Sequence, residues 1–198
     1  MTLCYKLLSK MDQVNGLYYI ENVIDEKHAD ELISQLDIQP WIPITDSSKS
    51  RKVQHYGFKY NYKTGNVKDV ADPIPDFMQT LLNDLSDICK TKAILSTFNQ
   101  CIVNNYEVGQ SISPHIDHRN YGPVIGCYTL NSGATMRFRK GNQKVEIYVK
   151  PNSLYIMSED ARYNWTHEMT THKFDTTTDH EKVKRDRRIS ITFRYVEK

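Results

Sequence analysis

The spacing of hydrophobic residues divides the chain into a first part with helical periods and a second part with strand-like alternation. Residues 17–24 are rich in Tyr, Ile and Val and predict a strand, and Asp25 then offers a helix N-cap before an amphipathic stretch at 26–36. A second amphipathic stretch, 76–88, places its apolar residues on one helical face. From residue 98 onward short β-rich runs alternate with turn signals, which is typical of a sandwich or jelly roll.

Two polar stretches interrupt this pattern. Residues 53–62 alternate as a strand toward a turn at 64–66 and predict a hairpin arm. The stretch 175–186 has no apolar period and predicts a mobile loop or an insert. We therefore expect a single, mostly β domain, in which residues 1–96 supply N-terminal helices and the hairpin arm and residues 97–198 form the jelly-roll core.

Composition narrows the class of protein. A hydrophobic content of 39% with 25% charged residues is ordinary for a soluble globular chain, and no apolar run is long enough to span a bilayer, so no membrane partner is expected. The first residues lack the apolar core and cleavage site of a secretory signal, which predicts an intracellular protein, cytoplasmic or nuclear. The four cysteines form no CxxC pair, so neither a zinc ribbon nor a disulfide framework is predicted.

The net charge of +2 is too small to indicate nucleic-acid binding by itself. Basic residues do cluster at 49–52, 137–140 and 182–188. Each cluster is either a contact for a polyanion or solvated surface.

The sharpest chemical feature is the pair His115 and Asp117. On a strand, residues i and i+2 project from the same face, so this imidazole and carboxylate can bind one metal ion. A further histidine would complete the facial triad of non-haem Fe(II) oxygenases, which leaves three coordination positions open. An isolated HxD is more often a surface histidine beside a solvated aspartate.

Downstream histidines compete for the third ligand position. His118 follows Asp117 directly and points to the opposite strand face, and His180 lies in the polar stretch, so both are poor ligands by geometry. His167 lies in the β-rich half, and His172 shares a Thr-rich segment with it. The residues alone do not separate these two.

The C-terminal run 188–194 predicts a strand with one apolar and one cationic face. The polar face carries Arg188, Ser190, Thr192 and Arg194. Because a buried guanidinium must be paired, two inward arginines predict an anion inside the barrel, and an arginine fork suits a dicarboxylate such as 2-oxoglutarate. Asn104 and Tyr106 also share a strand face and can hydrogen-bond a carboxylate. The alternative is an edge strand with solvated arginines.

These motifs resemble, in their order and spacing, the AlkB family of nucleic-acid dioxygenases. The resemblance covers Asn104-x-Tyr106-x-x-Gly109, His115-x-Asp117, His167 and Arg188-x-Ser190-x-Thr192-Phe193-Arg194. It implies a double-stranded β-helix (jelly roll) and an Fe(II)- and 2-oxoglutarate-dependent dioxygenase that uses O₂ and releases succinate and CO₂. The implied catalytic iron ligands are His115, Asp117 and His167. The implied 2-oxoglutarate contacts are Asn104, Tyr106, Arg188, Ser190 and Arg194.

The same resemblance implies a substrate class: a modified nucleobase in RNA, tRNA or DNA, which is demethylated or hydroxylated. Nucleic-acid demethylation, DNA repair and tRNA modification are the corresponding roles. The segments 51–58, 162–167 and 173–175 are most similar to the tRNA wobble-uridine hydroxylases of the family. The alternatives are oxidation of a protein side chain and a catalytically silent binding module, of which the second predicts a broken ligand set. The oligomeric state is left open.

The hairpin arm is similar in position to the nucleotide-recognition lid of the family. His55, Tyr56 and Phe58 are therefore expected to be available to stack on a base. Arg119 is a further candidate substrate contact, because it stands where the founding bacterial enzyme has an acidic residue that faces the damaged base. Ser190 replaces an asparagine of the family pattern.

Overall fold

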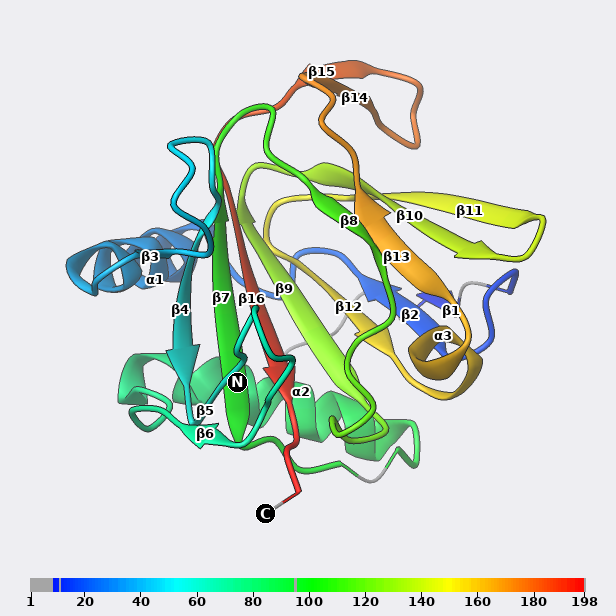
Figure 1. Cartoon of the computed structure of the whole chain (residues 1–198). Coiled ribbons are helices and arrows are strands. Elements are labelled where there is room, and N and C mark those ends of the chain that lie inside the picture. The colour runs from blue at the N-terminus through cyan, green and yellow to red at the C-terminus, as the bar shows by residue number, and fades with distance from the viewer. Residues whose placement is uncertain (1–8, 11, 95, 198) are drawn as a thin grey trace.

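Two antiparallel sheets that face each other form the body of the protein (Figure 1). The computed structural model describes residues 9–10, 12–94 and 96–197. The larger sheet consists, in spatial order, of β1 (Ser9–Lys10), β2 (Leu17–Ile20), β12 (Ser153–Met157), β9 (Ile125–Asn131), β16 (Arg188–Arg194), β7 (Gln100–Tyr106), β4 (Lys52–Tyr56) and β3 (Ile42–Pro43). The smaller sheet consists of β11 (Gln143–Val149), β10 (Ala134–Lys140), β13 (Thr166–Met169) and β8 (Ile112–His115). This is the mostly β, jelly-roll fold that the sequence predicts.

Both predicted helices are present, and each extends slightly beyond its predicted end. They are α1 (Glu26–Ile38) and α2 (Gln79–Thr91), which the short helix η1 (Asp76–Met78) precedes. Asp25 caps α1 as expected, because its carboxylate accepts a hydrogen bond of 2.8 Å from the backbone N–H of His28. Both helices cover the outer face of the larger sheet (Figure 1). The contact with α2 is close at Gly126, where an added Cβ would lie 2.5 Å from a methyl carbon of Leu85.

Strand β16 separates two environments, as its alternation predicts. Ile189, Ile191 and Phe193 are fully buried in the core between the larger sheet and the helices. Burial of each such side chain stabilises the fold by roughly 1.5–3 kcal/mol. The opposite face of β16 points between the two sheets, so the same core that fixes the strand also orients its polar residues toward the site.

The predicted hairpin arm at 53–62 is not one continuous strand. Its first part is β4, which pairs with β7 in the larger sheet. At Gly57 the chain turns with a φ of 74°, and an added Cβ would lie only 1.9 Å from the carbonyl oxygen of Asn99, so glycine is required here. The second part forms a separate small sheet of β5 (Phe58–Lys59) and β6 (Asp69–Val70).

The stretch 175–186, predicted as a mobile loop or insert, contains a short hairpin instead. Its strands are β14 (Phe174–Thr176) and β15 (Lys182–Lys184). Asp175 and Arg185 form a buried ion pair across it, and Arg185 also donates to the carbonyl oxygen of Thr170. A charged pair organises this hairpin, which explains why the hydrophobic pattern did not indicate it.

Strands from residues before 97 join strands from residues after 97 in the larger sheet. Strands β1 and β2 extend one side of the larger sheet next to β12, and β3 and β4 extend the other side next to β7. The N-terminal part therefore supplies both edges of the sheet that carries the polar face of β16.

Two predictions from composition can also be compared with the structure. Cys89, Cys101 and Cys127 are free and buried, and Cys4 lies outside the described residues. In the part of the chain that the structure describes, no helix combines the length and apolar character needed to cross a bilayer.

Candidate active site

Two histidines and one aspartate converge at one point between the sheets. Strands β8 and β13 are neighbours, and His115 pairs in register with His167, with 4.2 Å between the ring centroids. Asp117 follows the end of β8 and reaches the two rings from a loop, not from the strand that we expected. One donor atom from each side chain lies within 4.8 Å of the others. His172 is not part of this group, so the structure selects His167 as the third member.

All three side chains are held in the form that binds a metal ion. His115 Nδ1 donates to the carbonyl oxygen of Ser113 at 2.8 Å, which leaves Nε2 with its lone pair. Burial, with a smaller contribution from the neighbouring His115, lowers the pKa of His167 to about 3, so the imidazole is neutral near pH 7. Burial opposes the charge on Asp117, but Arg194 and the two histidines outweigh it and hold the pKa of Asp117 below its usual range.

Arg194 positions the carboxylate of Asp117. Its Nε and Nη2 lie 2.9 and 2.7 Å from Oδ1 of Asp117. The other oxygen, Oδ2, is buried without a hydrogen-bond partner among the described residues and lies 3.5 Å from Nε2 of His167. Two imidazole nitrogens and a free carboxylate oxygen are the donor set of a non-haem Fe(II) site, so these residues fit iron. Arg194, predicted to contact 2-oxoglutarate, binds Asp117 and also lines the cavity beside the triad, where its buried Nη1 has no hydrogen-bond partner among the described residues.

An inner chamber beside the triad fits a dicarboxylate. In the pairing of β16 with β7, Arg188 lies opposite Tyr106 and Ser190 lies opposite Asn104, and all four line this chamber. Nη2 of Arg188 donates to Oγ1 of Thr129 at 2.8 Å, whereas its buried Nε has no partner within the described part of the chain. A buried guanidinium N–H without an acceptor favours an anion, and a co-substrate carboxylate would supply that acceptor.

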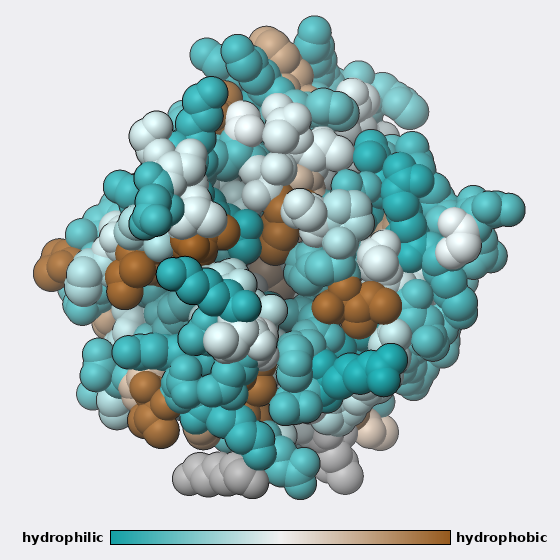
Figure 2. Space-filling model, in the orientation of Figure 1, coloured by the Kyte–Doolittle hydropathy of each residue, from teal (hydrophilic) through white to brown (hydrophobic). Residues whose placement is uncertain are grey.

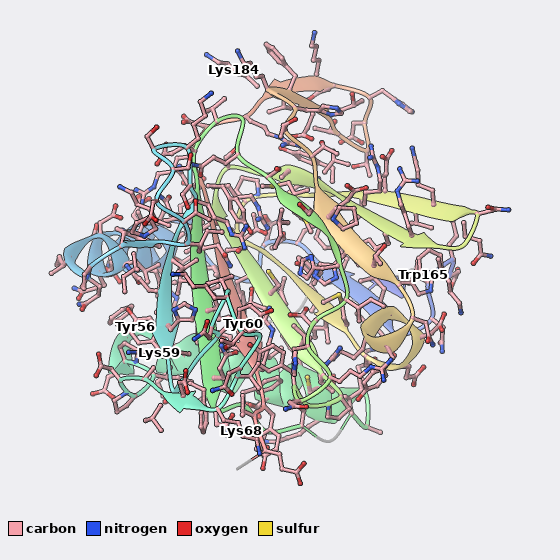
Figure 3. The ribbon with its side chains drawn as sticks, viewed as in Figure 1. Tyr56, Lys59, Tyr60, Lys68, Trp165 and Lys184 are labelled. Atoms are coloured by element: carbon pink, nitrogen blue, oxygen red, sulfur yellow. The ribbon has the colours of Figure 1, made fainter. Side chains whose placement is uncertain are left out.

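An outer chamber of about 290 Å³ opens on the other side of the triad. It shares His115, Asp117 and Arg194 with the inner chamber. Its aromatic walls are formed by Tyr60, Tyr62, His118 and Tyr121. The molecular surface is hollowed near the middle of this face (Figure 2), and Tyr60 lies near the middle of the same view (Figure 3).

The four residues predicted as substrate contacts do not line this outer chamber. His55 lines a neighbouring groove, with its ring centroid 5.9 Å from that of Tyr62. Tyr56 is buried against the helices and donates to Oε1 of Gln54, so its ring is not available to stack on a base. Phe58 packs in a small cluster with Val67 and Val196. Arg119 is exposed at the surface.

The wall residues that were missed follow a recognisable signal. Tyr60 and Tyr62 follow Phe58 at every second position, and this aromatic repeat was the available signal. The resemblance of the hairpin arm to the family's lid had instead indicated His55, Tyr56 and Phe58.

The loop after Asp117 depends on a residue for which the sequence motifs predicted no role. Arg162 belongs to the short helix α3 (Glu159–Tyr163) and is only 1% exposed. Its guanidinium donates to the backbone carbonyl oxygens of Asp117, His118, Tyr121 and Gly122. One buried side chain therefore shapes the loop that carries a metal ligand and two walls of the outer chamber.

Relatives of this chain are found among oxygenases. The sequence model of the 2OG-Fe(II) oxygenase superfamily matches residues 16–194. An uncharacterized protein, L905, of Acanthamoeba polyphaga mimivirus is 30% identical, with 96% of this chain and 89% of that protein covered. The Xenopus tropicalis tRNA (carboxymethyluridine(34)-5-O)-methyltransferase alkbh8 is 32% identical over 81% of this chain, which spans only 26% of that protein. A Caenorhabditis elegans DNA N6-methyl adenine demethylase is 28% identical, with 92% of this chain and 60% of that protein covered.

Solved structures show the same fold at low sequence identity. OsALKBH1 has a TM-score of 0.69 at 15% identity and covers 95% of this chain and 99% of its own. A Pseudomonas putida prolyl-4-hydroxylase has a TM-score of 0.62 at 12% identity, with 92% of this chain and 94% of its own covered. With the family match, the triad and the two chambers taken together, the chain belongs to the 2OG-Fe(II) oxygenase superfamily and, within it, to the AlkB family, as an Fe(II)- and 2-oxoglutarate-dependent dioxygenase.

Proposed function

We propose that this dioxygenase oxidises a modified base in a nucleic acid, either RNA such as tRNA or single-stranded DNA. The outer chamber carries the proposal, because aromatic side chains that stack on unpaired bases line it next to the triad. Its volume of about 290 Å³ is small for a ligand pocket and suits one planar ring system. A base inside a duplex would have to be flipped out to enter it.

The names of the relatives support a nucleobase as substrate. The Xenopus protein is named for carboxymethyluridine 34 of tRNA and the C. elegans protein for N6-methyl adenine in DNA. A Danio rerio relative, 24% identical, is named a probable RNA/DNA demethylase. Two of these names state a modified base, two state a demethylase, and they differ in the nucleic acid, so they favour oxidation of a base without a choice between RNA and DNA.

The residues of the chain would divide the work between the two chambers. Bound Fe(II), 2-oxoglutarate and O₂ supply the oxidising power, with succinate and CO₂ as the co-products. Arg188 would hold a carboxylate of the co-substrate, while Arg194 engages Oδ1 of Asp117 and so would leave Oδ2 available to bind Fe(II). The aromatic walls would orient the base so that its substituent points at the triad, and they would exclude water from it.

The chemistry of the substituent decides the product. A hydroxylated N-methyl group breaks down to formaldehyde and the free amine, whereas a hydroxylated C-linked group keeps its oxygen. The same site would therefore demethylate the first kind of base and leave a stable hydroxyl on the second.

The distribution of surface charge favours one basic cluster over another as the contact for a nucleic-acid strand. In the cluster at 137–140, Arg137 and Arg139 pair with Glu168, and Lys140 pairs with Asp160. This cluster is largely neutralised. In the cluster at 49–52, no carboxylate of the described residues lies within 4.0 Å of the basic side chains, and Arg51 belongs to the wall of the outer chamber. The 49–52 cluster is therefore the better contact for a phosphate backbone.

Two measurements, made one after the other, test the proposed function. The first is anaerobic titration with Fe(II) and 2-oxoglutarate, which should give a visible charge-transfer band in the wild type but not in His115→Ala. The second is a screen of single-stranded oligonucleotides and tRNA with modified bases, in which succinate release and the mass of the base are both measured. If a protein substrate stimulates succinate release and no base is altered, the enzyme instead oxidises a protein side chain.

A further inference from the structure

We propose that the outer chamber accepts an uncharged or anionic base and excludes a cationic alkylated base, and that Arg51 is the residue responsible. This inference rests on the proposed function, because it concerns the charge of the base in the same chamber. It follows from the charges on the chamber wall, from the partners of its aromatic rings and from one unpaired hydroxyl.

The chamber wall offers no carboxylate to a cation. Among the described residues that line it, Asp117 is the sole acidic one, and Arg194 already engages it. Arg51 lies on the same wall, and no carboxylate of the described chain lies within 4.0 Å of it. Its Nε donates instead to the neutral Oδ1 of Asn104, at 3.2 Å. The charge of Arg51 is therefore not compensated locally, and bound iron would add further positive charge nearby.

Two of the three tyrosine rings that line the chamber, Tyr62 and Tyr121, already face a guanidinium. A cationic base could bind over a tyrosine face, as ammonium and guanidinium groups do. The guanidinium of Arg51 already lies 5.8 Å from the ring centroid of Tyr62 and 5.8 Å from that of Tyr106. Arg194 lies 4.9 Å from the ring centroid of Tyr121. A second cation in this space meets the guanidinium groups at short range, and such repulsion lowers affinity by roughly tenfold or more in a partly buried pocket.

One hydroxyl supplies the recognition that an uncharged base needs. Tyr121 is 4% exposed and lines the chamber, and its Oη has no hydrogen-bond partner among the described residues. Buried hydroxyls of this kind normally have a partner, so this one points to a ligand that donates to it or accepts from it. Arg119, whose position could have placed a charge near the base, is exposed and does not line the chamber.

Pairs of positional isomers that differ in charge test this proposal. At pH 7, N6-methyladenine and 5-methylcytosine are neutral, whereas 1-methyladenine and 3-methylcytosine are cations. Each base is placed in the same single-stranded oligonucleotide. Its kcat/KM is measured with the iron-loaded enzyme, and its affinity is measured anaerobically by fluorescence anisotropy with 2-oxoglutarate present. We expect the neutral isomer to be preferred by about tenfold or more within a pair, in affinity as well as in turnover.

Two substitutions assign the effect to Arg51. Arg51→Gln should reduce the preference for the neutral isomer by about tenfold, and Arg51→Glu should reverse it. Lys52→Gln is the matched control, because it removes the same charge from the next residue, which is exposed. Lys52→Gln should leave the preference unchanged. For each variant, the ratio of kcat/KM and the ratio of affinity are taken between the two isomers. Any general loss of activity that follows from the lost contact of Arg51 with Asn104 therefore cancels.

The outcomes separate this inference from the proposed function. If the wild type oxidises bases but treats both isomers alike, or prefers the cation, the charge proposal is wrong and the proposed function stands. If Arg51→Gln keeps the full preference, Arg51 is not the determinant and the proposal is wrong in that respect. If no base is bound or oxidised while 2-oxoglutarate is still turned over, both the proposed function and this inference are wrong.

Discussion

Arg188 and Arg194 lie on the same face of β16 but have different partners. Arg194 binds the carboxylate of Asp117, whereas Arg188 contacts Thr129 in the inner chamber. We expect Arg194→Met to weaken Fe(II) binding by about 10–100-fold, the usual effect of losing an outer-shell partner. Arg188→Met should weaken 2-oxoglutarate binding and leave the affinity for metal unchanged. Anaerobic titrations with metal alone, and then with 2-oxoglutarate, measure the two affinities separately.

A conservative variant and a folding measurement serve as controls, because a variant that is not folded would also lose metal affinity. Arg194→Lys keeps the positive charge but not the two-point contact, so its affinity for Fe(II) should lie between those of the wild type and Arg194→Met. Circular dichroism should be the same for all the proteins compared. Equal loss of metal affinity in the Arg188 and Arg194 variants would show that the two arginines do not divide the site as described.

His55 makes the stability of the fold depend on pH. Burial, with smaller contributions from the charges of Lys59 and Arg194, lowers the pKa of His55 to about 4. The unfolded chain takes up this proton near pH 6.5, whereas the folded chain does so only near pH 4. Between these values the unfolded state binds more protons, so stability is lost as the pH falls, by up to about 3 kcal/mol.

Urea unfolding at pH 7 and at pH 4.5 measures this effect. His55→Gln should lose less free energy of unfolding on acidification than the wild type does. The lowered pKa of His167 acts in the same direction, but it is present in both proteins and cancels in the difference. The same pH dependence in wild type and variant would contradict the prediction.

At the scale of elements, the short helix α3 holds the loop that follows β8 through Arg162. Arg162→Met would leave several buried carbonyl oxygens without a donor, each at a cost of about 1–3 kcal/mol. We expect the free energy of unfolding to fall by at least about 3 kcal/mol and the affinity for Fe(II) to fall with it. Arg137→Met is the matched control, because Arg137 pairs with Glu146 and Glu168 near the surface and should contribute about 1 kcal/mol or less. Equal losses in the two variants, measured by urea denaturation, would argue against this role of Arg162.

The local sequence pattern was sufficient to predict elements that are marked by alternating residues or by a capping residue. The alternation of 188–194 was sufficient to predict which residues face the inner chamber, and Asp25 was sufficient to predict where α1 begins. The choice of His167 over His172 depends instead on the register of β13 against β8, and nothing local in the sequence encodes that register.

The hairpin arm at 53–62 shows a second limit of prediction from local sequence pattern. A glycine inside an alternating stretch is compatible with a continuous strand, a bulge or a sharp turn. At Gly57 the positive φ and the nearby backbone of Asn99 make it a turn, so β4 ends at Tyr56 in the larger sheet, whereas Tyr60 beyond the turn lines the outer chamber. The contact with Asn99 is distant in sequence, so it could not be predicted from the residues around Gly57.

At the scale of the whole molecule, the catalytic strands depend on the N-terminal part. Residues of α1 and α2 form the core against which Ile189, Ile191 and Phe193 pack. Strand β4 pairs with β7 along five residue pairs, from Lys52 with Asn105 to Tyr56 with Cys101. The arginines of β16 are therefore held in place by residues that the sequence pattern had assigned to a separate part of the chain.

This dependence predicts that residues 97–198 do not fold alone. Without residues 1–96, the apolar face of β16 would be exposed and β7 and β12 would become unprotected edges, which favour aggregation. We expect the 97–198 fragment to lack a near-UV circular dichroism signal and to give no charge-transfer band with Fe(II) and 2-oxoglutarate. Co-expression with the 1–96 fragment should restore both signals, because the missing strands and helices would then be supplied in trans. A 97–198 fragment that folds and binds both ligands by itself would show instead that the jelly-roll core is sufficient, and that the N-terminal strands contribute to the substrate chamber alone.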